Sequence, residues 1–270
     1  MMSGFQRDNL EKFYTNQEIA KKCIDLFIET IEPNINDIVI EPSAGTGSFS
    51  DYLKEIFPNM FAYDLIPGKS YILQQDYLKY SFPPNLLETK HVIGNPPFGR
   101  QSSLVRKFVK KSAEFADTIS FILPKSFKKQ SLQRVFPPCY HLKKEYNLPN
   151  NSFTINGKTH DVPCIFQIWK RENHPREIEV VQQPLFFKFV KKNSSNIDFS
   201  IRRVGGTAGK IDSNWQSKSK SSHYFILLNP MINKEYFLEK YNNIIFDLDN
   251  TVGPKSISKP ELIKKINSLF

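Results

Sequence analysis

The chain has 270 residues, of which 40% are hydrophobic and 24% charged, and its formal net charge is +10. This composition excludes a disordered chain, and no apolar run approaches the ~20 residues that a membrane span needs. The first residues lack the apolar core of a signal peptide, and the three cysteines are widely spaced without a CxxC pair, so neither a disulfide scaffold nor a zinc ribbon is expected. We therefore expect an intracellular, cytoplasmic protein with no membrane partner and no metal.

The first half of the chain alternates predicted helices and strands. Apolar residues at helical spacing between residues 8 and 31 predict a helix that ends before Pro33. Strands are predicted at Asp37–Glu41, Met60–Tyr63, Ile72–Leu78, His91–Gly94 and Thr118–Leu123, and helices at Ser48–Phe57 and about Ser102–Phe115. This alternation predicts an α/β fold with a Rossmann-like, mostly parallel sheet.

In the second half of the chain, the regular alternation of helices and strands stops. Tyr140–Leu148 and Val162–Lys170 read as two strands joined by a polar turn around Asn156-Gly157, so the sheet is expected to end in an antiparallel hairpin. Further β-like and helix-like runs follow at Leu185–Val190, Phe199–Val204, Tyr224–Leu228, Asn233–Tyr241 and Pro260–Phe270. We expect one domain at residues 1–175 and a smaller α+β region at residues 176–270.

Basic and acidic residues are distributed unevenly along the chain. Residues 1–100 hold 9 basic and 13 acidic side chains, whereas residues 101–270 hold 28 and 14. Clustered cations gain free energy by releasing counterions from phosphates, so the second part favours a nucleic-acid partner. Within it, Arg202, Arg203 and Lys210 flank a glycine pair and are the candidate nucleic-acid contacts.

The sharpest motif is Asn95-Pro96-Pro97-Phe98, directly after a predicted strand. Ligands of open α/β sheets bind beyond the carboxyl ends of the strands. The two prolines fix the backbone and remove two N–H groups. The Asn95 side-chain oxygen and the Pro96 carbonyl then supply two acceptors, which suit an –NH2 group on a planar substrate, and Phe98 offers a stacking face.

A glycine-containing turn follows the first predicted strand, in the segment Glu41–Phe49. Gly45 and Gly47 allow the backbone to approach a ligand at a helix N-terminus. The third glycine of a dinucleotide-binding fingerprint is replaced by Ser50, which disfavours a nicotinamide cofactor. Asp64, at the end of the next strand, lies where a ribose hydroxyl pair would be held.

Together these motifs resemble the S-adenosylmethionine-dependent adenine-N6 methyltransferases of nucleic acids, in the group whose cofactor motif precedes the catalytic motif. The resemblance covers residues 12 to about 171, and the one departure we note is Asn16, where a proline is usual. The matching segments are Lys12–Thr15, Glu41–Phe49, Asp64, Gln75–Leu78, Asn95–Phe98 and Leu148–Phe153.

The resemblance implies a role for each matched residue. A cofactor site for S-adenosylmethionine would comprise Tyr14, Thr15, Glu41, Ser43, Gly45, Gly47, Phe49, Asp64, Asp76 and Tyr77. The catalytic site would comprise Asn95, Pro96, Pro97, Phe98 and Phe153, the two aromatic rings holding an extruded adenine between them. Methyl transfer from a sulfonium needs orientation more than a metal or a general base.

These expectations favour a site-specific DNA adenine-N6 methyltransferase, with residues 1–175 catalytic and residues 176–270 recognising the target. An RNA methyltransferase acting on adenine N6 or guanine N2 is the alternative. A protein glutamine methyltransferase is less favoured, because such enzymes usually carry tyrosine where Phe98 stands. A binding module on an inactive scaffold is disfavoured by the intact motifs. The sequence contains no nuclease constellation, so an accompanying restriction activity would belong to another chain.

Overall fold

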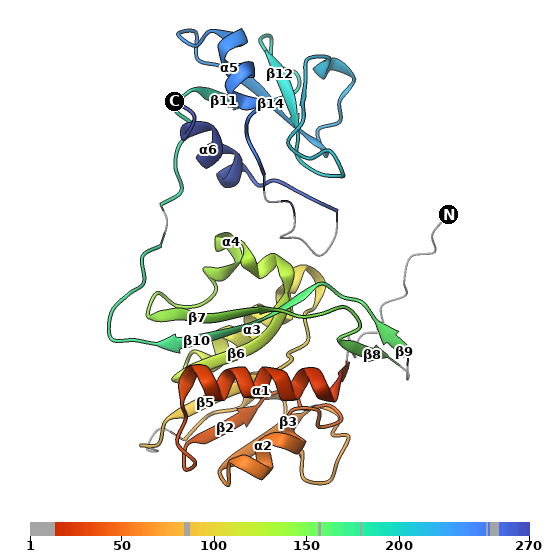
Figure 1. Cartoon of the computed structure of the whole chain (residues 1–270), viewed down its shortest axis with the longest axis vertical. Helices are drawn as coiled ribbons and strands as arrows, with labels where there is room; N and C mark the ends of the chain where they lie inside the picture. The colour runs from red at the N-terminus through yellow and green to blue at the C-terminus, as the bar shows by residue number, and fades with distance from the viewer. Residues whose placement is uncertain (1–13, 84–86, 156–157, 179, 247, 249–253) are drawn as a thin grey trace. The chain divides into compact units, whose positions relative to one another are not determined.

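The computed structural model describes residues 14–83, 87–155, 158–178, 180–246, 248 and 254–270 (Figure 1). The chain divides into two compact units, a first unit that ends at Ile178 and a second unit from Glu179 to Phe270. Residues 8–13, where the first helix was expected to begin, and the turn at Asn156-Gly157 lie outside the described residues.

The first unit contains a short strand before its first helix and then an alternating β/α series. Its elements are β1 (Tyr14–Thr15), α1 (Gln17–Ile31), β2 (Ile38–Glu41), α2 (Ser50–Ile56), β3 (Met60–Asp64), β4 (Leu73–Gln74), β5 (Lys90–Gly94), α3 (Ser103–Ser112), β6 (Thr118–Pro124), α4 (Gln130–Gln133), β7 (Tyr140–Asn147), β8 (Phe153–Ile155), β9 (Lys158–His160) and β10 (Cys164–Arg171). Short 3₁₀ turns lie at Tyr77–Lys79, Arg100–Ser102 and Lys125–Lys128.

Seven of these strands form one sheet in the order β4-β3-β2-β5-β6-β10-β7. The pairs from β4 to β6 are parallel, and β10 runs antiparallel to both β6 and β7. This is the strand order of the Rossmann-like methyltransferase fold, so the predicted fold class and the antiparallel end of the sheet are confirmed. The segment between β7 and β10 forms the hairpin β8–β9, and β8 pairs with β1 in a separate three-stranded sheet.

The central sheet is buried on both faces. Along β10, Phe166 and Ile168 join the core under α1 and α2, whereas Ile165 and Trp169 join the core under α3. Figure 1 shows α1 lying over one face of the sheet, in about the same direction as β7 and β10. Each fully buried large side chain contributes roughly 1.5–3 kcal/mol to the stability of the fold. Because both faces are buried, successive residues along a strand are apolar, and the strands read as continuous apolar runs.

One predicted strand is much shorter in the structure. The run Ile72–Leu78 pairs only over Leu73–Gln74 and then becomes a 3₁₀ turn. The Asp76 side chain accepts a hydrogen bond from the Leu78 amide at 3.1 Å. Because this carboxylate satisfies a backbone donor locally, the chain turns instead of continuing the ladder.

The second unit is an antiparallel sheet packed against two helices. Its elements are β11 (Phe187–Val190), β12 (Phe199–Arg202), β13 (Ile211–Asp212), β14 (His223–Leu228), α5 (Lys234–Tyr241) and α6 (Lys259–Asn267). The strand order is β11-β14-β12-β13, and α5 and α6 contribute Phe237 and Leu262 to its core. Among the described residues, no helix has the length and apolar character to cross a bilayer.

Candidate functional site

The first unit has a cavity of about 480 Å³ beyond the carboxyl ends of β2, β3 and β5. This is the edge of an open α/β sheet at which ligands bind, because the loops that leave adjacent strands diverge there. The predicted residues that line it are Tyr14, Thr15, Glu41, Ser43, Gly45, Phe49, Asp64, Asp76, Tyr77, Asn95, Pro96, Pro97 and Phe98. The structure therefore brings most of the predicted cofactor and catalytic residues into one cavity.

Gly45 is held tightly between a ring and a carboxylate. Its φ of +53° is a conformation that favours glycine, and an added Cβ would lie 3.1 Å from the Tyr14 ring. Its N–H donates to Asp64 Oδ2 at 2.7 Å, and its carbonyl accepts from the Gly68 N–H at 2.9 Å. The glycine turn is thus fixed by contacts from the strand before α1 and from the loop after β3.

Gly47 is required by the packing around the glycine turn. Gly47 is not one of the described residues that line the cavity. Its φ of +89° is a conformation that favours glycine. An added Cβ would lie 2.7 Å from the Tyr71 hydroxyl, which itself donates to Asp51 Oδ1 at 2.6 Å. Glycine is needed here so that the loop after β3 can pack on the turn, whereas the contact of Gly47 with a cofactor stays a prediction.

The Asp64 carboxylate faces the cavity while it holds the surrounding backbone. Oδ2 accepts from Gly45, and Oδ1 accepts from the Ile66 N–H at 2.8 Å. Each carboxylate oxygen can accept more than one hydrogen bond, so both oxygens retain the capacity to bind a pair of hydroxyl groups.

Glu41 is the buried carboxyl at the end of β2. Burial raises the pKa of its carboxyl to about 8, although the Ser50 hydroxyl donates to it. Glycine at position 94 makes room for it, since an added Cβ would lie 3.1 Å from Glu41 Cγ. The cavity therefore contains a carboxylic acid that is largely neutral at pH 7, which motif reasoning did not anticipate.

Asn95 is oriented by two neighbouring segments. Its Nδ2 donates to Thr15 Oγ1 at 3.1 Å, and its backbone carbonyl accepts from the Ser43 hydroxyl at 3.1 Å. Thr15 belongs to β1, which is held in place by pairing with Phe153 and Thr154 of β8. With its amide nitrogen directed to Thr15, the side-chain oxygen is the atom that Asn95 can offer to a substrate amine.

The two aromatic residues predicted to stack on a base have different surroundings. Phe98 lines the cavity, whereas Phe153 is completely buried and is not among the described residues that line it. Because β8 pairs with β1, the Phe153 ring packs into the core beneath α1, and Phe98 packs against the same core. In this structure Phe153 is a core residue, and its stacking on a target base stays a prediction.

Asp76 and Tyr77 reach the cavity through the 3₁₀ turn after β4. Asp76 caps that turn, and the Tyr77 hydroxyl lies 2.8 Å from Ser112 Oγ. Tyr77 also stacks on Phe108 of α3, with ring centroids 5.5 Å apart. These contacts fix the wall of the cavity that faces α3.

Several lining residues were not singled out by the motifs. They are Leu65, Ile66, Gly99, Arg100, Ser103, Leu104 and Phe108. Four of them lie within two positions of Asp64 or Phe98, so proximity in the chain was the available signal for these. Ser103, Leu104 and Phe108 are the exceptions, because only the packing of α3 brings them to the cavity.

The predicted nucleic-acid contacts lie together in the second unit. The Arg202 amide donates to the Lys210 carbonyl at 2.9 Å, so these two exposed residues are on paired segments. The Arg203 guanidinium lies over the Tyr224 ring at 5.4 Å, and Arg202 Nε donates to the Val204 carbonyl at 3.1 Å. All three residues are exposed near the end of β12, and together they make up the basic group of the second unit.

No family model matches the chain, and no curated protein matches it. Among solved structures, it is similar to a Pyrococcus horikoshii protein assigned as an RNA methyltransferase, at 17% identity and a TM-score of 0.49 over 63% of this chain and 92% of that chain. The 23S rRNA methyltransferase ErmE gives 16% identity and a TM-score of 0.45 over 61% of this chain and 71% of that chain. The N-methyltransferase NodS from Bradyrhizobium japonicum gives 10% and 0.42 over 57% of this chain and 95% of that chain. The fold assignment above depends on the strand order alone.

Proposed function

We propose that the first unit is an S-adenosylmethionine-dependent methyltransferase that modifies the N6 amine of adenine in nucleic acid, with DNA as the expected polymer. The observation that carries the proposal is the position of Asn95. It lies at the end of β5 with its amide nitrogen bonded to Thr15, in the same cavity as Asp64 and the glycine turn.

The residues at the β2 and β3 ends fit S-adenosylmethionine. Gly45 leaves no side chain between the Tyr14 ring and the turn, and Asp64 can accept from the ribose hydroxyls. Asp76 and Tyr77 supply the cavity wall for the adenine ring of the cofactor. When bound, this cofactor supplies an electrophilic methyl group on a sulfonium.

The Asn95–Phe98 segment fits the amine that receives the methyl group. The Asn95 side-chain oxygen and the Pro96 carbonyl can accept both hydrogens of an exocyclic amine, which favours a pyramidal nitrogen with a directed lone pair. An exocyclic amine is a weak nucleophile because its lone pair is delocalised into the ring. Orientation by these two acceptors is therefore the main contribution that we assign to the chain.

Phe98 is the aromatic side chain of the motif that can stack on the target base. A base in a duplex must leave the helix to reach a site of this kind, and stacking on a ring retains it at about 1–3 kcal/mol. We assign target recognition to the second unit, with Arg202, Arg203 and Lys210 as phosphate or base contacts.

The test is single-turnover methylation with Asn95→Ala. We expect the methyl-transfer rate to fall by at least ~100-fold, the scale of losing one oriented polar group in a closed site. Affinity for S-adenosylmethionine, measured by calorimetry, should change little because Asn95 serves the amine. The exposed Asn243 in the second unit provides a matched control, and Asn243→Ala should leave both quantities unchanged.

The same reaction identifies the polymer. Protein and labelled cofactor are incubated with duplex DNA, single-stranded DNA or RNA, and the products are digested to nucleosides. Label in N6-methyldeoxyadenosine supports the proposal in full, whereas label in N6-methyladenosine replaces DNA by RNA. Label in a methylated guanine or in protein, or a robust rate in Asn95→Ala, contradicts the adenine-N6 assignment.

A further inference from the structure

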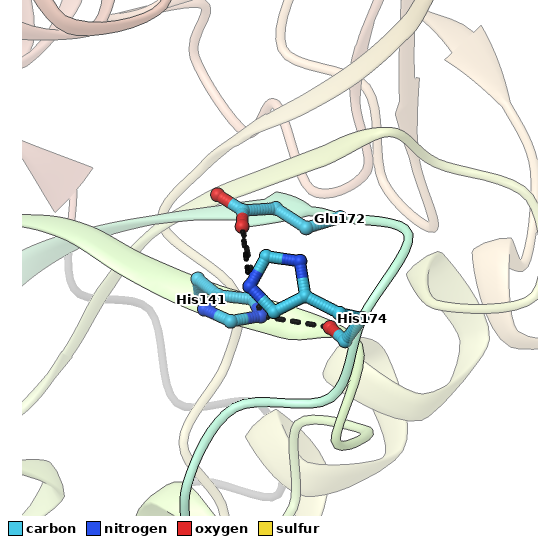
Figure 2. Close-up of side chains that lie close together, drawn as sticks. All are labelled: His141, Glu172 and His174. Atoms are coloured by element: carbon cyan, nitrogen blue, oxygen red, sulfur yellow. Dashed lines mark hydrogen bonds and ion pairs between the residues drawn. The ribbon is translucent and has the colours of Figure 1, made fainter.

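Three side chains of types that bind metals meet at the edge of the central sheet, away from the cavity. His141 lies near the start of β7, and Glu172 and His174 follow the end of β10. Figure 2 shows the two imidazole rings and the carboxylate gathered at this point. One candidate ligand atom from each residue lies within 4.8 Å of the other two.

The distances suit one small ion. Glu172 Oε2 lies 3.4 Å from His174 Nε2 and 3.8 Å from His141 Nε2. Ligands at the 2.0–2.1 Å bond lengths of tetrahedral zinc are about 3.4 Å apart. The two distances from Glu172 to the histidines are therefore close to the ligand spacing of a tetrahedral zinc site.

The surrounding structure holds these side chains in place. Lys143, also on β7, forms an ion pair with Glu172 Oε1, which leaves Oε2 directed at the histidines. The Glu172 amide donates to the Cys139 carbonyl at 2.8 Å. Two residues beyond His174, the Arg176 guanidinium donates to the carbonyls of Pro137 and Tyr140, each at 2.6 Å. The segment that carries two of the ligands is thus fixed against the strand that carries the third.

We propose that His141, Glu172 and His174 bind Zn²⁺ or a similar transition-metal ion, with water as a fourth ligand. Imidazole and carboxylate are the donors that zinc accepts, and two histidines with one carboxylate leave a position open for water. Two neutral imidazoles and one carboxylate give the ion and its ligands a charge of about +1. Mg²⁺ and Ca²⁺ prefer all-oxygen ligands and should not compete.

Binding requires a defined change at the histidines. His141 Nε2 now lies 2.9 Å from the His174 carbonyl, a distance at which it donates its proton. To bind the ion through Nε2, each imidazole must be neutral with its proton on Nδ1, so the hydrogen bond to the carbonyl is given up.

Such an ion would join the last strand of the central sheet to the chain that leaves it. Glu172 and His174 are among the last residues of the first unit, and His141 is on the edge strand β7. Binding would stabilise the folded first unit by mass action, because the ligands come together only when β7 and β10 are paired. The proposal is independent of the methyltransferase chemistry.

The experiment uses the full chain, purified without a histidine tag and treated with a chelator, and titrates Zn²⁺ by calorimetry. We expect one ion per chain and a rise in the thermal unfolding midpoint. His174→Ala should weaken binding at least ~10-fold, since even outer contacts of metal sites contribute that much. His174 is 69% exposed, so this change should not impair folding. His160→Ala is the matched control, because His160 lies in β9 outside the cluster.

Zinc binding could also come from a cysteine thiolate, and Cys139→Ser tests this alternative. Zinc binding that survives Cys139→Ser and His160→Ala but is weakened by His174→Ala and by His141→Ala supports the site. Tetrahedral absorption by Co²⁺ in the same sample supports it further. The proposal is overturned by the absence of stoichiometric binding, by binding that needs Cys139 and not the histidines, or by equal competition from Mg²⁺.

Discussion

At the scale of single residues, the Asp64 carboxylate has two kinds of contact. Both of its oxygens accept backbone N–H groups, from Gly45 and from Ile66, and it also faces the cavity. A substitution here must therefore affect the shape of the glycine turn as well as any ligand. The two effects can be separated, because asparagine keeps one oxygen acceptor and alanine keeps none.

We expect Asp64→Ala to weaken S-adenosylmethionine binding by about 1–3 kcal/mol, since hydroxyl groups in the site lose an ionised acceptor. Asp64→Asn should fall between the wild type and the alanine variant. Calorimetry measures the affinity, and circular dichroism checks that the fold is intact. Equal affinity in all three proteins would refute the assignment of Asp64 to the cofactor.

Glu41 predicts a pH dependence of stability. Burial raises the pKa of this carboxyl from its ordinary value of 4.5 to about 8. Between these pH values the unfolded chain releases the proton while the folded protein keeps it. The contribution to stability is therefore complete below pH 4.5, falls as the pH rises, and is lost by about pH 8.

Glu41→Gln replaces the carboxyl by an amide that does not titrate. The free energy of unfolding of this variant, relative to the wild type, should therefore increase by up to about 1.4 kcal/mol per pH unit between pH 5 and 8. Urea unfolding at several pH values measures the difference. Glu55→Gln, on the exposed face of α2, should show a constant difference across the series. A constant difference for Glu41→Gln as well would mean that the carboxyl is ionised in the folded state.

The sequence was sufficient to place residues that directly follow a parallel strand. Glu41, Asp64 and Asn95 share one edge of the sheet because the carboxyl ends of parallel strands lie together. The orientation of Phe153 could not be predicted in this way, since it depends on the pairing of β8 with a strand nearly 140 residues earlier. His141 and Glu172 are likewise neighbours only through the pairing of β7 with β10.

At the scale of elements, Arg176 joins the end of the first unit to α4 and β7. Its guanidinium lies over the Trp169 ring at 5.2 Å. It donates to four backbone carbonyls, those of Gln133, Phe136, Pro137 and Tyr140. The division between the units falls after Ile178, three residues beyond the boundary expected at 175.

We expect Arg176→Ala to lower the free energy of unfolding of the first unit by about 1.5–3 kcal/mol, the range for hydrogen bonds to a charged group. Arg176→Lys should recover less than half of this loss. A single ammonium group cannot reproduce the planar set of N–H donors with which the guanidinium reaches four carbonyls. Urea unfolding in a Trp215→Phe background leaves Trp169 as the fluorescent reporter. Full recovery by lysine would show that charge alone matters.

At the scale of the whole molecule, basic charge is shared between the units. Residues 101–178 hold 14 basic and 6 acidic side chains, a balance of 14 − 6 = +8, and the second unit holds 14 and 8, a balance of 14 − 8 = +6. The predicted charge asymmetry therefore does not coincide with the division into units. Phosphate contacts are expected from both.

Neutralising the basic group of the second unit should remove part of the salt dependence. We expect Arg202→Gln with Arg203→Gln to lower nucleic-acid affinity and to reduce the slope of log K against log salt by about 1–2, leaving cofactor affinity unchanged. Lys264→Gln with Lys265→Gln, on the exposed face of α6, is the charge-matched control. Equal losses in the two double variants would assign the effect to net charge and not to a specific contact.

The pairing of β1 with β8 has a consequence for the order in which the chain is made. Thr15, which orients Asn95, lies in a strand whose partner begins at Phe153. A growing chain that has reached residue 120 on the ribosome already contains the glycine turn, Asp64 and the Asn95–Phe98 segment. It still lacks the partner strand that fixes Thr15 beside Asn95, so the proposed amine-binding site is assembled late in synthesis, after the residues that form it have been translated.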